Sequence, residues 1–188
     1  MRLYLFLIAL STLLITLLNQ FFATPAAAWG LLPLILLVVG EVVAVILIDS
    51  LGAYLIRRLP EKRFEAERPA FRVSRREYRL WRALGVRLWC EKIPELGGFS
   101  GFHKDRVREP RSKAYLERFL LESNYGVIIH SVNALSGFLL LALFPRITLS
   151  VALPVALVNT LLSLMPLGAL RYNTHGLLSL YRRVKARG

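Results

Sequence analysis

The chain has 188 residues, and at 55% hydrophobic residues it is too apolar for an ordinary soluble domain. Of its 25 Lys and Arg residues, 18 lie between Arg57 and Arg118 and 5 between Arg171 and Arg187. Because these residues flank long apolar stretches, we attribute the net charge of +13 to membrane topology and exclude nucleic acid as a partner. The pattern predicts an all-α integral membrane protein: a four-helix bundle with a cytoplasmic or interfacial amphipathic helical platform between spans 2 and 3.

Residues 1–56 contain the first two apolar stretches, and we expect them to form transmembrane helices 1 and 2. The first stretch runs from about Leu3 to Ala23. It resembles a signal peptide, but its apolar run is longer than a usual signal core, so we expect an uncleaved helix. The second runs from about Leu31 to Ile56 and carries the acids Glu41 and Asp49. Both reach the roughly 20 residues that a helix needs to cross a bilayer.

Residues 57–125 predict a basic amphipathic platform. Ser74 followed by Glu77 is a capping-box pattern that marks a helix start. Arginines alternate with apolar residues along this helix, as in a helix that lies among lipid headgroups. A glycine-rich turn follows, and a second amphipathic helix begins near Ser112 and can continue directly into the third span. We expect the platform to contact anionic lipid headgroups.

Residues 126–170 contain transmembrane helices 3 and 4, predicted at about Gly126–Phe144 and Ile147–Leu170, and residues 171–188 form a basic tail. An even number of spans places the N-terminus, the platform and the tail on one side of the membrane. That side holds almost all of the basic residues and should therefore be cytoplasmic.

Three polar residues near the cytoplasmic ends of the spans are candidates for catalysis. Glu122 and His130 are eight residues apart, so on a helix they project within about 80° of each other. A neutral His130 imidazole can take a proton from a hydroxyl while a carboxylate, from Glu122 or Asp49, holds its tautomer. The alternative is that these are packing residues, each held by a hydrogen bond.

Arg171 and Asn173 close the fourth span on the same side and are candidates for stabilising an oxyanion or holding a sugar. The alternative is that an arginine at the cytoplasmic end of a span only fixes the orientation of the protein in the membrane. Lys92 and Lys104 are candidates for binding phosphates as point charges, and Trp89 completes the candidate substrate-binding set. The three histidines lack metal-ligand spacing and there is one cysteine, so we expect neither a metal nor another cofactor.

Several short motifs, taken in order, resemble those of one family. They are Trp89-Cys90-Glu91-Lys92-Ile93-Pro94, then Gly97-Gly98-Phe99 with Lys104, Tyr115-Leu116-Glu117-Arg118-Phe119, Glu122 with His130, and Arg171-Tyr172-Asn173. This ordered set resembles the bacterial glycosyl-4,4'-diaponeurosporenoate acyltransferase family, over roughly Tyr78 to Leu180. The chain departs from the family pattern at three places. Cys90 replaces a Lys, Val127 replaces a second acid, and Thr174-His175 replace Arg-Pro. These departures allow a different acceptor or a loss of catalysis.

The resemblance implies a multi-pass protein of the bacterial inner membrane, with cytoplasmic termini, that esterifies the sugar of a glycosylated carotenoid. The acceptor would be that glycoside or a related membrane glycolipid. The donor would be an acyl thioester, either acyl-CoA or an acyl-carrier thioester. Two other hypotheses stay open: a non-catalytic membrane scaffold or lipid-binding subunit, and a transporter that uses Glu41 and Asp49 as a proton relay.

Overall fold

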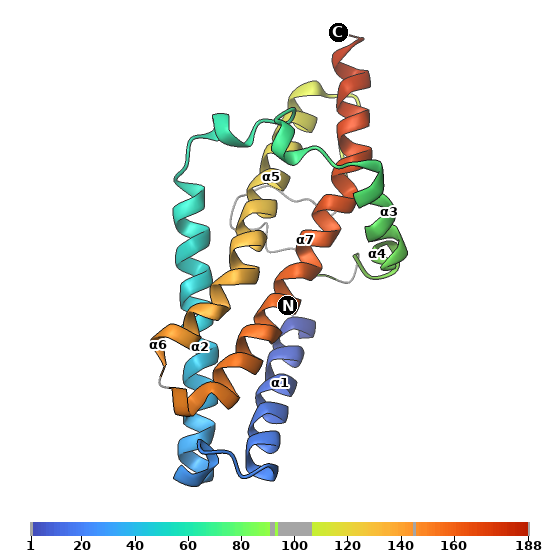
Figure 1. Cartoon of the computed structure of the whole chain (residues 1–188). Helices are drawn as coiled ribbons and strands as arrows, with labels where there is room; N and C mark the ends of the chain where they lie inside the picture. Colours follow the sequence, from blue (N-terminus) through green and yellow to red (C-terminus); the bar gives the residue numbers. More distant parts are fainter. Residues whose placement is uncertain (1, 91–92, 94–106, 145, 188) are drawn as a thin grey trace. The chain divides into compact units, whose positions relative to one another are not determined.

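The structure is a computed structural model of the chain (Figure 1). It describes residues 2–90, 93, 107–144 and 146–187. Every regular element among these residues is an α-helix or a 3-10 helix, and none is a strand. The all-α fold class predicted from the sequence is therefore confirmed.

Four helices are long and apolar enough to cross a membrane, judged by length and composition. They correspond, in chain order, to α1 (Arg2–Phe21), α2 (Leu31–Arg57), α5 (Lys113–Ser136) and α7 (Leu149–Lys185). The third continues through η6 (Gly137–Leu139) and α6 (Leu140–Leu143). Many of their leucines are exposed, which hydrocarbon tolerates and water does not. These are the helices of a membrane protein.

The last two of these helices are longer than the predicted spans. Helix α5 begins at Lys113 and runs without a break to Ser136, so the second amphipathic helix does continue into the third apolar stretch. Helix α7 continues 15 residues past Leu170 to Lys185, through the predicted tail. The reason is that this tail has no proline and buries Leu177, Leu178 and Tyr181 on one side.

The chain divides into two compact units. Unit 1 comprises Met1–Tyr54 and Ser131–Leu164, and unit 2 comprises Leu55–His130 and Met165–Gly188. The division passes through α2, α5 and α7, and each unit has a buried core of its own. Every contact described below lies within one unit.

Unit 1 is held by apolar packing, by one close helix approach and by buried hydrogen bonds. A Cβ at Gly137 would lie only 3.1 Å from the Cα of Ala156, so a residue without a side chain is needed at this crossing. The Nδ2 of Asn159 donates to the carbonyl of Asn133 at 2.8 Å. The buried core includes Ile15, Leu34, Val38, Val45, Leu140, Val151, Ala152 and Val155.

In unit 2, the connection from α2 to α3 packs on the first half of α5. This connection contains two short 3-10 helices, η2 (Glu61–Phe64) and η3 (Pro69–Phe71). The ring of Phe64 stacks on that of Tyr125, with 3.9 Å between centroids. The Tyr125 hydroxyl donates to the carbonyl of Leu59 at 2.9 Å, and Asn124 Nδ2 donates to the carbonyl of Phe64 at 2.9 Å. The segment that follows α2 is thereby fixed to α5.

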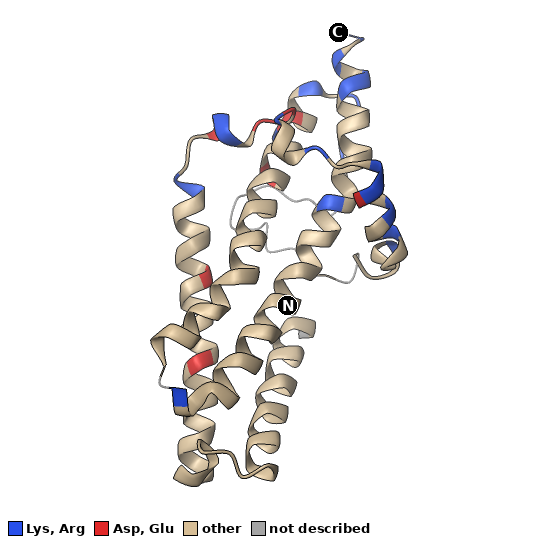
Figure 2. Ribbon diagram, viewed as in Figure 1, with Lys and Arg blue, Asp and Glu red and all other residues tan. Residues whose placement is uncertain are grey.

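Helices α3 (Arg75–Ala83) and α4 (Val86–Trp89) follow in unit 2. The Ser74 hydroxyl accepts a hydrogen bond from the backbone N–H of Glu77 at 3.1 Å, so the predicted helix start is confirmed. The sequence indicated one helix from Ser74 to the glycine-rich turn, but Gly85 adopts a left-handed φ of 69° and separates α3 from α4. Glycine adopts this conformation without steric cost. Figure 2 shows the row of basic residues along α3 and the basic residues in the last turns of α7.

Candidate functional site

Glu122 lies at the centre of an ion-pair network in unit 2. Its side chain, on α5, is fully buried. Arg57 Nη1 lies 2.6 Å from its Oε2, and Arg118 Nη2 lies 2.7 Å from its Oε1. The other Arg118 nitrogen, Nη1, lies 3.2 Å from a carboxylate oxygen of Glu61. A buried carboxylate is stable as an anion only with such partners, so Glu122 is a fixed negative charge.

His130, the predicted base, lies on the same helix and is partly buried. Eight residues of helical rise separate its Cα from that of Glu122 by about 12 Å. The carboxylate of Glu122 contacts Arg118, which is one turn farther from His130. Glu122 can therefore act on the imidazole as a fixed charge at a distance. The catalytic role of both residues stays a prediction.

Asp49, the third predicted catalytic residue, lies in unit 1. It accepts a hydrogen bond from the Ser136 hydroxyl and interacts with Asn159, so it links α2, α5 and α7 within that unit. The other acid of α2, Glu41, is fully buried beside Thr148. Hydroxyl and amide partners are what a carboxyl group needs at membrane depth. A part for Asp49 in catalysis stays a prediction.

Arg171, predicted to hold substrate, is bound by Glu77 of α3. Its Nε and Nη2 donate to the two carboxylate oxygens at 2.6 and 2.7 Å. Nη1 donates to the carbonyl of Phe71 and Nη2 to that of Arg72, both at 3.2 Å. These bonds use four of the five guanidinium N–H groups. Burial alone would raise the pKa of the Glu77 carboxyl, but the hydrogen bonds and charge of Arg171 outweigh burial and hold that pKa below its ordinary value.

Aromatic contacts beside this ion pair fix α3 against α7. Trp81 Nε1 donates to Glu77 Oε1 at 3.3 Å, and its indole lies against Gly168. The ring of Tyr78 stacks on Tyr172 and on His175, with centroid distances of 5.1 and 4.4 Å. Arg171 is thus held in place by a helix that itself has several anchors.

Two of the remaining predicted binding residues, Asn173 and Trp89, lie on described helices. Asn173 is exposed on α7. Trp89, at the end of α4, donates from Nε1 to the carbonyl of Leu84 at 3.1 Å. Lys92 and Lys104, predicted to bind phosphates, lie outside the described residues. Their roles stay predictions.

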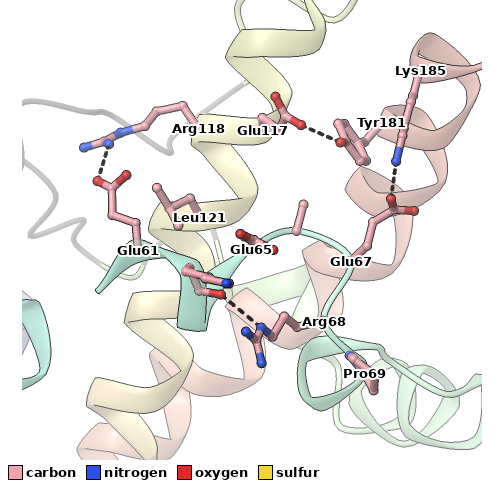
Figure 3. Close-up of a pocket in the computed structure, with 12 residues that line it drawn as sticks. Glu61, Glu65, Glu67, Arg68, Pro69, Glu117, Arg118, Leu121, Tyr181 and Lys185 are labelled. Carbon is pink, nitrogen blue, oxygen red and sulfur yellow. Dashed lines mark hydrogen bonds and ion pairs between the residues drawn. The ribbon is translucent and has the colours of Figure 1, made fainter. Parts of the chain in front are cut away.

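Unit 2 also contains a polar pocket of about 900 Å3. Figure 3 shows its wall, to which the α2–α3 connection, the start of α5 and the end of α7 contribute. Tyr181 donates to Glu117 at 2.7 Å, and Lys185 is paired with Glu67. The lining carries equal numbers of acids and bases: Glu61, Glu65, Glu67, Glu117, Lys62, Arg68, Arg118 and Lys185.

Sequence reasoning missed the partners of the two central ion pairs. The four-residue spacing of Arg118 and Glu122 is a signal for an ion pair on one helix face. No local signal links Arg57 to Glu122, or Glu77 to Arg171. Among the described residues there is no group of three or more His, Cys, Asp or Glu side chains that could hold a metal ion.

Comparison with known proteins identifies the family. The family model described as glycosyl-4,4'-diaponeurosporenoate acyltransferase matches residues 60–183, which include Glu77, Glu122, His130 and Arg171. No curated protein and no solved structure matches the chain. Because the match covers about two thirds of the chain, the chain belongs to the glycosyl-4,4'-diaponeurosporenoate acyltransferase family.

Proposed function

We propose that the chain transfers a fatty acyl group from an acyl thioester to a sugar hydroxyl of a glycosylated carotenoid or a related glycolipid. The family is one of acyltransferases in carotenoid glycosyl ester synthesis. The observation that carries the finer proposal is the arrangement on α5. A fully buried carboxylate, Glu122, is held as an anion by two guanidinium groups, and an imidazole, His130, follows on the same helix. Acyl transfer to a hydroxyl is accelerated by a base that takes the hydroxyl proton, and His130 is the candidate for that base.

In the proposed mechanism His130 is the general base. Its imidazole takes the proton of the sugar hydroxyl while the hydroxyl oxygen forms a bond to the thioester carbonyl carbon. The C–S bond of the tetrahedral intermediate then breaks, and the imidazolium returns the proton to the leaving thiolate. Glu122 is the carboxylate proposed to orient the ring; it acts from a distance, and Arg57 and Arg118 balance much of its charge.

The other predicted residues would bind the two substrates. Arg171 and Asn173 would stabilise the oxyanion or hold the sugar, Arg171 through the N–H group that its internal bonds leave over. Lys92 and Lys104 would bind phosphates of the donor as point charges. Trp89 would pack against the donor.

The polar pocket of unit 2 supports a water-side position for the donor. Tyr181 of this pocket is 11 residues past Leu170, the last residue of the apolar stretch, which corresponds to about 16 Å along α7. A headgroup layer is only about 5–8 Å deep. The pocket therefore suits the water-soluble part of an acyl thioester better than a membrane-held glycoside. Lys62 and Arg68 in its wall are further candidates for binding the donor's phosphates.

The proposed setting is the bacterial inner membrane, with four spans and both termini cytoplasmic. The basic residues of α3 and of the last turns of α7 support this orientation. The apolar body of the acceptor would lie among the spans and present its sugar at the cytoplasmic surface. Apart from the acyl thioester and the acceptor, this chemistry needs no cofactor.

A non-catalytic scaffold is the second candidate. It is favoured by the commitment of Glu122 and Arg171 to internal ion pairs, which is what a purely structural role requires. The two candidates differ in one measurable respect. The enzyme forms the ester and loses this activity when the His130 imidazole is removed and the fold is retained, whereas the scaffold forms no ester at all.

The experiment uses the full chain in nanodiscs with a glycosylated carotenoid and an acyl-CoA, and detects the ester by mass spectrometry. We expect the wild-type protein to form the ester and His130→Ala to lose it with an unchanged unfolding midpoint. His175→Ala removes the other imidazole that the structure describes and should keep ester formation. Ester formation at the wild-type rate by His130→Ala would remove the proposed base, and no ester from the wild type with any acyl thioester would favour the scaffold.

A further inference from the structure

Helix α3 descends along α7 toward the apolar part of the chain. Near its start, Tyr78 stacks on His175 and Tyr172, and one turn later Trp81 lies against Gly168. Because Glu77, in the first turn, contacts Arg171, the contacted position on α7 moves by three to seven residues, or about 5–10 Å of helical rise. The apolar stretch of α7 ends at Leu170. The end of α3 therefore lies at the level where α7 enters the hydrocarbon.

Three leucines at this level are open to the surroundings. Leu80 and Leu84 of α3 expose 56% and 57% of their surface, and Leu88 of α4 exposes 79%. The side of α3 that contacts α7 is formed by Glu77 and Trp81, and the two leucines lie beside it, since Leu84 and Leu80 are about 20° and 60° from Glu77 around the helix. On a helix, Leu80 and Leu84 lie within about 40° of each other, so they form one apolar strip. Water does not stabilise such a strip, whereas the acyl-chain boundary of a bilayer does.

The rest of the surface of α3 is basic. Its four arginines, Arg75, Arg76, Arg79 and Arg82, are all exposed. Within the part of the chain that the structure describes, none of them forms an ion pair. Arg75 and Arg76 lie in the first turn of α3, on the water side of Leu80 and Leu84, and Arg79 follows one turn later, about 7.5 Å of helical rise before Leu84. The placement of these arginines before the leucines matches phosphate headgroups above acyl chains, and the long side chain of Arg82, which lies between the two leucines, can extend toward the headgroups.

We propose that α3 and α4 form an interfacial anchor for anionic phospholipids. Leu80, Leu84 and Leu88 enter the acyl-chain boundary, and Arg75, Arg76 and Arg79 bind lipid phosphates. The depth of the leucines selects this occupant, because an acidic soluble protein would reach the arginines without covering the strip. The anchor then holds Glu77, and through it Arg171, at a fixed level of the membrane.

The test uses the full chain in nanodiscs, with Cys90→Ser so that one introduced cysteine carries a spin label. Leu84→Cys and Arg79→Cys are compared in phosphatidylcholine, with and without phosphatidylglycerol. The ratio of oxygen collisions to collisions with a water-soluble nickel chelate is expected to be several-fold higher at position 84 than at 79. That ratio at position 84 should rise further when phosphatidylglycerol is added. Leu88→Cys is a second probe if Leu84→Cys does not fold.

A charge-matched pair of variants tests the role of the anionic lipid. Changing Arg75, Arg76 and Arg79 to Gln should abolish the response to phosphatidylglycerol. Changing Arg182, Arg183 and Arg187 to Gln removes the same charge from the end of α7 and should preserve that response. The proposal is overturned by a nickel-accessible label at position 84 in both lipids, by a label shielded from both reagents, or by a response to an added acidic soluble protein alone.

Discussion

Trp81 occupies the space that a side chain at Gly168 would need. A Cβ on Gly168 would lie 2.8 Å from Cζ3 and 2.9 Å from Cε3 of the indole. Glycine inside a helix costs about 1 kcal/mol relative to alanine. This glycine is nevertheless the residue that lets α3 dock on α7 and bring Glu77 to Arg171.

Gly168→Ala should therefore destabilise unit 2, because the added methyl group displaces the indole. Overpacking costs about 1–3 kcal/mol, which is partly offset by the gain in helix propensity. We expect a net loss of up to about 2 kcal/mol in the free energy of unfolding, measured by titration of the reconstituted protein with denaturing detergent. Gly176→Ala is the matched control on the same helix, since nothing lies within 4 Å of its Cβ. Equal effects of the two variants would contradict the docking.

The ion pair between Glu77 and Arg171 should make stability depend on pH in the acidic range. The pKa of Glu77 is lowered in the folded protein, so its contribution is fully present above the unfolded-state pKa of about 4.3 and is lost as pH falls through the folded-state value. Glu77→Gln should cost about 1.5–3 kcal/mol at pH 7. The difference between wild type and variant should shrink below pH 4. Detergent unfolding across this range measures it, and a difference that stays constant down to pH 3 would contradict the argument.

Features set by local sequence could be predicted, and features set by tertiary packing could not. The apolar stretches near Leu3 and Leu31 were predicted within two residues of the observed helix starts, because hydropathy and length alone decide them. The helix start at Ser74 also depends on a short pattern. The break at Gly85 was missed, because a glycine inside an amphipathic spacing does not reveal its φ.

The candidate site was harder to predict for the same reason. Arg57 was attributed to topology, yet it reaches a carboxylate 65 positions away at Glu122. Glu77 was recognised only as part of a cap, yet it holds Arg171 across 94 positions. Burial decides the pairing of Glu122, since a buried carboxylate must find a cation, whereas the docking of α3 on α7 brings the partly buried Glu77 to Arg171. A single sequence does not show which of many arginines will be nearest.

Loss of the Glu122 charge should destabilise unit 2 more than loss of a neighbouring exposed charge. Glu122→Gln leaves Arg57 and Arg118 beside a buried neutral group, but their side chains are 34% and 44% exposed, so water partly solvates the freed charges. We therefore expect a cost of about 1.5–3 kcal/mol, the range for hydrogen bonds to charged groups. The other partner of Arg118 is Glu61, and the Glu61 side chain is 66% exposed. Glu61→Gln should therefore cost less than about 1 kcal/mol. Detergent unfolding of both variants checks the contrast. Similar losses would show that the network does not centre on Glu122.

The pocket cations give a prediction that separates donor binding from catalysis. Lys62 and Arg68 line the pocket, whereas Arg63, adjacent in sequence to Lys62, is not among its lining residues. If they bind phosphates of the donor, Lys62→Ala combined with Arg68→Ala should raise KM for acyl-CoA about tenfold. This corresponds to about 1.4 kcal/mol, within the range expected for hydrogen bonds to charged groups. The value of kcat should stay nearly unchanged, because neither side chain takes part in proton transfer.

Arg63→Ala is the control, since it removes a neighbouring charge and keeps the pocket intact. Its KM for acyl-CoA should stay within twofold of the wild-type value. A fall in kcat with unchanged KM in the double variant would show that Lys62 and Arg68 act on the fold or on a later step. A KM change of equal size in Arg63→Ala would mean that general surface charge attracts the donor. A specific binding site, in contrast, depends on which of two neighbouring cations lines it.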